Sequence, residues 1–118
     1  MRGVKPGITS CWQRLLIGFG LVVAADITVA ATPEIELRIS DHLFFPATIE
    51  VPAGTKVKLL IDNQDDTPEE FESYEMNREK VIPGKTKTVI FIGPLKPGEY
   101  PFFGEFYPKT AQGKVIAQ

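Results

Sequence analysis

The feature that most constrains the fold is a strict alternation of apolar and polar residues that begins at residue 34. Segment 34–40 (EIELRIS) places an isoleucine or a leucine at every second position, and segment 56–61 repeats this pattern with valine, leucine and isoleucine. A period of two residues is typical of a β-strand that buries one face and exposes the other. The sequence therefore predicts a sheet with one face in a core.

Further short apolar segments follow, and turns that contain proline or glycine separate them. The predicted strands lie at 34–40, 47–51, 56–61, 88–92, 100–103 and 114–117, and segment 69–82 is predicted as strand, loop and strand. Residues 41–46 are predicted as a turn region. Because no segment shows a convincing helical period, the pattern predicts an all-β fold, a Greek-key β-sandwich of about seven strands.

The N-terminal segment has the layout of a secretory signal peptide. Arg2, Lys5 and Arg14 precede the apolar run 15–25, and small residues at 29–31 place a cleavage point before Thr32. We therefore expect residues 1–31 to be a signal peptide, residues 32–118 to form one domain, and the protein to be periplasmic. The alternative is an uncleaved membrane anchor, although the run is shorter than the roughly 20 residues of a membrane span.

Charge and cysteine content exclude several function classes. The chain has a formal charge of −2, and residues 32–118 keep ten of the 13 Lys and Arg and 14 of the 15 Asp and Glu, so their charge is about −4. An acidic domain argues against nucleic acid as a partner. The only cysteine, Cys11, precedes the apolar run, so the domain after cleavage can form neither a disulfide nor a thiolate metal site.

Two long strings carry a family resemblance. VPAGTKVKLLIDN at 51–63, followed by PGEYPFFGEFYPKTAQGKV at 97–115, resembles the cupredoxin family over nearly all of residues 35–117. TPEEFESYEMNREKVIPG at 67–84 is similar to a branch of that family, the EfeO-type, iron-transport-associated proteins of the bacterial periplasm. This resemblance implies a copper or iron ion held by carboxylate and His ligands. The implied partner is a membrane iron permease or another periplasmic transport component.

The resemblance also shows that the ligands of a blue-copper site are missing. Blue-copper members use a His after the third or fourth strand, and a Cys, a His and a Met on the loop before the last strand. The resemblance places Gly104 at the Cys, Tyr107 at the His and Gln112 near the Met, with Glu69 or Glu70 near the first His. Tyr107 also replaces the His of the FGEFH motif frequent in the iron-associated branch. Because a His₂Cys site produces blue-copper electron transfer, we do not expect that function here.

Acidic residues are the remaining candidate ligands. A run of glutamates extends from 69 to 79, and the last loop, which a cupredoxin fold brings to the same end of the sandwich, adds another. Oxygen ligands suit hard cations, and carboxylates combined with Tyr or His would suit iron. We predict a copper or iron ion held first by Glu70, Glu72 and Glu105, with Tyr107 and Met76 as second choices. The alternatives are a solvated acidic surface and, for Glu79, local ion pairing with Arg78 and Lys80.

The expected function is a periplasmic metal-binding protein associated with iron or copper uptake, which assists Fe(II) oxidation or delivers the ion to a permease. A non-metal module that docks on a permease through its acidic end is the alternative. A hydrolytic enzyme using Glu70 and Glu105 as a carboxylate pair is disfavoured, because no nucleophile with an adjacent base is present. His42, the only histidine, is expected to be structural.

Overall fold

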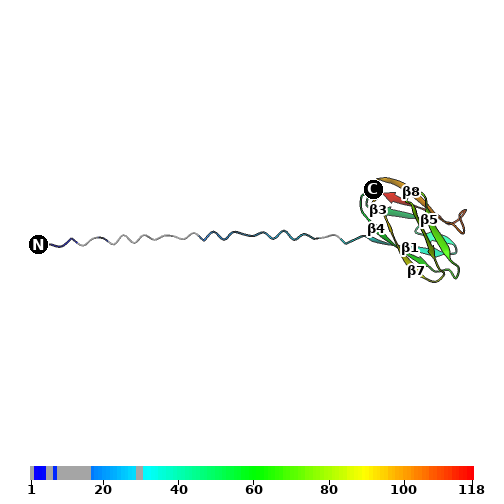
Figure 1. Cartoon of the computed structure of the whole chain (residues 1–118), viewed down its shortest axis with the longest axis horizontal. Coiled ribbons are helices and arrows are strands. Elements are labelled where there is room, and N and C mark those ends of the chain that lie inside the picture. Colours follow the sequence, from blue (N-terminus) through cyan, green and yellow to red (C-terminus); the bar gives the residue numbers. More distant parts are fainter. Residues whose placement is uncertain (1, 5–6, 8–16, 29–30) are drawn as a thin grey trace.

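The computed structural model describes residues 2–4, 7, 17–28 and 31–118. The described residues form nine strands and no helix (Figure 1). The strands are β1 (Glu34–Ser40), β2 (Leu43–Phe45), β3 (Thr48–Val51), β4 (Val57–Asn63), β5 (Glu69–Ser73), β6 (Arg78–Ile82), β7 (Lys87–Ile92), β8 (Gly98–Gly104) and β9 (Gln112–Ala117).

These strands pair into two sheets that pack face to face. The first sheet has the order β2-β1-β4-β7, and the second has the order β3-β9-β8-β5-β6. The pairs β1/β4 and β3/β9 are parallel, and the other neighbouring pairs are antiparallel. The predicted all-β sandwich is confirmed: about seven strands were expected and nine are present, of which only β2 lies outside the predicted strand segments.

The core lies between the two sheets and follows from the alternation seen in the sequence. Leu37 and Ile39 on β1, and Leu59 and Ile61 on β4, are buried, while the residues between them are partly or fully exposed. Three phenylalanines close the centre, with ring centroids 5.0–6.1 Å apart: Phe44, Phe71 and Phe102. Aromatic rings at such separations add to the stabilisation from area burial.

The predicted turn region 41–46 contains a strand that the sequence did not indicate. Asp41 and His42 both have positive φ angles, 50° and 62°, and Ser40 pairs with Leu43 directly across them. Two consecutive residues with positive φ are the requirement of a tight two-residue hairpin turn. The turn is therefore shorter than expected, and residues 43–45 are free to extend the first sheet.

The two ends of the sandwich carry different segments. At one end the amide of Lys58 donates to Pro33 and that of Ala53 donates to Gln118, so the domain begins and ends there (Figure 1). At the opposite end lie residues 41–42, 64–68 and 105–111, which we call the loop end.

The N-terminal predictions fall largely outside the described residues. Residues 29–30 of the predicted cleavage motif, and Cys11, are not described, and residues 17–28 contain neither helix nor strand. Within the described ranges, no helix has the length and apolar character needed to cross a membrane.

Candidate functional site

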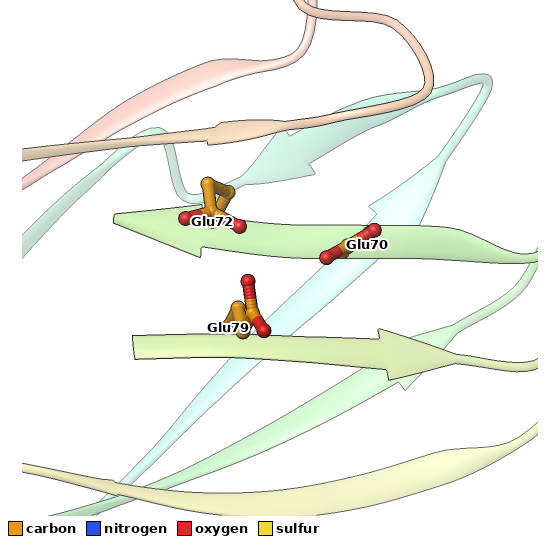
Figure 2. Close-up of side chains that lie close together, drawn as sticks. All are labelled: Glu70, Glu72 and Glu79. Atoms are coloured by element: carbon orange, nitrogen blue, oxygen red, sulfur yellow. The ribbon is translucent and has the colours of Figure 1, made fainter. Parts of the chain in front are cut away.

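Neighbouring strands of the second sheet build an acidic cluster on its outer face. Because side chains alternate along a strand, β5 buries Phe71 in the core and sends Glu70 and Glu72 outward. Glu79 on β6 pairs directly across from Glu72. Each of the three glutamates offers a carboxylate oxygen, and these oxygens lie within 4.8 Å of one another (Figure 2). Glu70, Glu72 and Glu79 are hereafter the acidic cluster.

Glu72 is the most enclosed member of the acidic cluster, with 9% of its surface exposed. Its pKa is raised above the usual carboxyl value, first by burial and then by the negative charge of Glu79, a hydrogen bond to Glu79, and the charges of Glu70 and Glu105. Burial and neighbouring like charges both disfavour an ionised carboxyl group. The acidic cluster therefore favours the binding of a proton or a cation between its carboxylates.

The alternative that ion pairing with its neighbours explains Glu79 is wrong. In the domain formed by residues 31–118, Glu79 makes no ion pair with Arg78 or Lys80. The Arg78 guanidinium instead donates to the backbone carbonyls of Phe91 and Asn77. The Arg78 guanidinium is therefore bonded to backbone carbonyls and not to the Glu79 carboxylate.

The other predicted ligands lie outside the acidic cluster. Glu105 donates its backbone N–H to the carbonyl of Glu70 at 2.9 Å, and its charge reaches Glu72. Its carboxylate is not among the three that converge. The Tyr107 ring stacks on His42 with centroids 3.7 Å apart, and Met76 belongs to the buried core. The structure thus brings Glu70 and Glu72 together and adds Glu79 to them.

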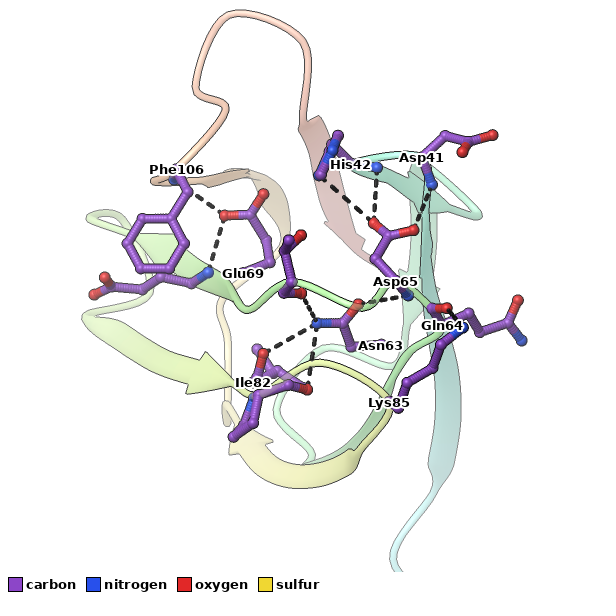
Figure 3. A network of polar contacts seen from close by, with 12 residues as sticks. Asp41, His42, Asn63, Gln64, Asp65, Glu69, Ile82, Lys85 and Phe106 are labelled. Atoms are coloured by element: carbon purple, nitrogen blue, oxygen red, sulfur yellow. Dashed lines mark hydrogen bonds and ion pairs between the residues drawn. The ribbon is translucent and has the colours of Figure 1, made fainter.

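A second carboxylate, Glu69, occupies the place where the resemblance implies a blue-copper ligand set. Glu69 is 1% exposed, and its Oε1 accepts hydrogen bonds from the backbone N–H groups of Glu70 and Phe106 at 2.9 and 3.0 Å (Figure 3). Its buried Oε2 has no hydrogen-bond partner. A Cβ atom on Gly104 would lie 2.6 Å from the Glu69 Cδ. A cysteine therefore has no room at Gly104, and these residues do not fit a blue-copper centre.

Polar contacts fasten the loop end. The Asp65 carboxylate accepts the backbone N–H groups of Asp41 and His42 at 2.8 and 2.9 Å, and it lies 3.6 Å from the His42 ring (Figure 3). Since His42 also stacks on Tyr107, these contacts join three loops. Buried Asn63 adds hydrogen bonds from its side-chain amide to the carbonyls of Thr67, Ile82 and Pro83. His42 thus links the loops of this end through its contacts with Asp65 and Tyr107.

Comparison with known proteins agrees with this architecture. An uncharacterized protein of Rickettsia prowazekii (strain Madrid E) is 48% identical over 83 residues, which are 70% of this chain and 66% of that protein. The chain therefore spans slightly less than two thirds of that relative.

Solved structures share the fold at low sequence identity. Auracyanin A, a "blue" copper protein of Chloroflexus aurantiacus, superposes with a TM-score of 0.63 and 13% identity over 75% of this chain and all of that chain. The metal-binding domain of the Cu(I)-exporting P-type ATPase CopA of Streptococcus pneumoniae D39 gives 0.64 and 16% over 77% and 91%. The family model of the cupredoxin-like domain matches residues 13–117. The chain belongs to the family of cupredoxin-like domains.

Proposed function

We propose that this protein is an exported metal-binding domain that holds a copper or iron ion on the outer face of the second sheet. The observation that carries the proposal is the acidic cluster, in which three carboxylate oxygens converge within 4.8 Å. Like charges at this distance repel one another unless a proton or a cation lies between them. A bound cation would remove this repulsion and gain three oxygen ligands at once.

The ligand chemistry narrows the choice of ion. Carboxylate oxygens suit hard cations, whereas thiolates and thioethers select Cu(I). The acidic cluster therefore supports Cu(II) or an iron ion. Copper is supported by the relatives whose names state that they bind it. Iron is supported by the sequence resemblance to the iron-associated branch.

The proposed role is delivery of the ion to a partner in the periplasm, a membrane iron permease or another transport component. A site on an open sheet face can take up and release an ion without rearrangement of the core. Oxidation of Fe(II) at the same site would in addition need an electron acceptor, so delivery is the step we propose.

Metal titration of the full chain tests this function. Calorimetry and thermal unfolding with Cu(II), and with Fe(II) in the absence of oxygen, should show binding and a rise in Tm, because a ligand that binds only the folded state stabilises it by mass action. The double variant Glu72→Gln/Glu79→Gln should lose both effects. Glu50→Gln, which changes an exposed carboxylate on strand β3 of the same sheet, should retain them.

A second double variant separates the two candidate ligand sets. Glu72→Gln/Glu105→Gln tests the carboxylate expected from the sequence, and a loss greater than that of Glu72→Gln alone would show that Glu105 also coordinates the ion. If wild-type protein shows neither heat of binding nor a Tm shift with either metal, the proposal is refuted.

A further inference from the structure

Two hollows lie on neighbouring pairs of strands of the second sheet. The first is a cavity of about 390 Å³ at strands β8 and β9, and we call it the apolar hollow; it is lined by Pro101, Phe102, Phe103, Pro108, Gln112 and Gly113. The second, of about 300 Å³, we call the acidic hollow; it includes Glu72, Tyr74, Arg78 and Glu79.

The two hollows share a boundary made of aromatic residues. Phe103, which lines the apolar hollow, is the register partner of Glu72, which lines the acidic hollow. Tyr74 packs on Phe103 with ring centroids 5.5 Å apart, and 71% of Tyr74 is exposed. A molecule that lies across this pair would contact both hollows at once.

The acidic hollow lacks a basic counterpart of its own. Within residues 31–118, the hydrogen-bond partner of the Glu72 carboxylate is another acid, Glu79, although only 9% of Glu72 is exposed. The one cation that lines the hollow, Arg78, directs its guanidinium to the carbonyls of Phe91 and Asn77. The hollow therefore presents unpaired negative charge beside an apolar surface.

We infer that these two hollows bind one segment of a partner protein, an extended stretch in which an apolar side chain and an arginine or lysine lie on the same face. Because β8/β9 and β5/β6 are neighbouring strand pairs, the middle of one pair is two strand spacings, roughly 10 Å, from the middle of the other. In an extended segment, residues i and i+2 point the same way and lie about 7 Å apart, and an arginine side chain spans the rest. A guanidinium also offers a fork of donors that matches carboxylates better than an ammonium group.

This inference shares the acidic cluster with the proposed function but does not need a metal. Charge complementarity identifies the partner as a basic segment, and the apolar hollow distinguishes it from any cation that binds carboxylates alone. The volume of the apolar hollow, about 390 Å³, lies near the lower end of the range of ligand pockets, so the hollow has room for an apolar side chain. Binding of a metal and of the segment should compete, because both use Glu72 and Glu79.

The test uses the full chain in EDTA, so that no metal contributes. The probe is a fluorescent nine-residue peptide in which leucine and arginine occupy the odd positions in turn and serine fills the even positions, so that leucine and arginine share one face of the extended chain. In the matched peptides, serine replaces leucine or glutamate replaces arginine. Fluorescence anisotropy should show binding of the first peptide only, at least tenfold tighter than either matched peptide. Glu72→Gln/Glu79→Gln should weaken binding at least tenfold, and so should Pro101→Ser/Pro108→Ser, whereas Glu50→Gln should not change it.

Equal binding of the leucine and serine peptides would show electrostatic attraction alone and would overturn the inference. Unchanged binding by Glu72→Gln/Glu79→Gln would do the same. If a variant does not fold, amide chemical shifts of the wild-type protein decide: changes on titration must map to residues 72–79 and 101–113. Peptide binding without metal binding refutes only the proposed function, and metal binding without peptide binding refutes only this inference.

Discussion

Gly104 and Glu69 form a coupled pair of residues at the loop end. The Glu69 carboxylate lies against the backbone of Gly104, and its Oε1 accepts the N–H of Phe106 on the following loop. Glu69 therefore ties strand β5 to the loop 105–111 at the loop end. A side chain at position 104 and a long carboxylate at position 69 exclude each other for lack of space.

Gly104→Ala should destabilise the protein by about 1–3 kcal/mol, which is the usual cost of overpacking a well-packed site. The added methyl group would meet the Glu69 Cδ at 2.6 Å and the Ala111 Cβ at 2.8 Å. Denaturant unfolding measures the change. In a double-mutant cycle, Glu69→Ala should recover part of the loss caused by Gly104→Ala; strictly additive effects would show that the two residues are not coupled.

At the scale of elements, the β5–β6 hairpin carries an arrangement that sheets usually avoid. Glu72 and Glu79 are directly opposed across the two strands, and like charges in this position destabilise a strand pair. The apolar contacts of Phe71 and Ile82 beneath the hairpin, both fully buried, compensate for the repulsion. A cation bound between these two carboxylates would stabilise the hairpin, whether it is a metal ion or the basic side chain of a partner segment.

Glu72→Gln should stabilise the metal-free protein at neutral pH and have little effect in acid. The pKa of Glu72 is raised in the fold by burial and by Glu79, so the folded state binds this proton more tightly than the unfolded state does. The contribution of this proton to the free energy of unfolding is complete below the ordinary carboxyl pKa. It is lost as pH rises through the raised pKa of Glu72 in the folded state. Thermal unfolding as a function of pH measures this. A wild-type minus variant difference that does not change with pH would contradict the raised pKa.

Some strands could be predicted from the sequence, and others could not. Strand β1 and strand β4 were predicted because their alternation decides which face is buried. Strand β2 was missed, since two of its three residues, Leu43 and Phe45, are partly exposed apolar side chains and the turn before it uses Asp and His rather than Gly. Glu70 and Glu72 were predicted to face the same way.

Glu79 was missed because its partner depends on the register of the hairpin. Placing a tight turn at residues 74–77 would have set Glu79 opposite Glu72, but the local sequence alone was equally compatible with ion pairs along β6. The burial of Glu69 could not be predicted at all, since it results from the absence of a side chain at Gly104, on another strand.

At the scale of the whole molecule, the fold is that of copper proteins but the ligand set is not. The Cys11→Ser variant of the full chain should therefore lack the intense visible absorption of a blue-copper site when Cu(II) is added, because no thiolate remains for charge transfer. Weak absorption typical of oxygen ligands is the expected result. An intense blue band in this variant would contradict the conclusion that Glu69 and Gly104 leave no such site.

The whole molecule can bind a periplasmic partner only if it is exported. We expect protein from a periplasmic fraction to begin at or near Thr32, because small residues at 29–31 follow an apolar run of signal-peptide length. Leu21→Arg places a charge inside that run and should retain nearly all of the protein in the cytoplasm, while leaving residues 34–117 unchanged. N-terminal sequencing of each cell fraction gives the answer. Intact Met1 in the membrane fraction would instead support an uncleaved anchor, which would hold the domain at the membrane surface.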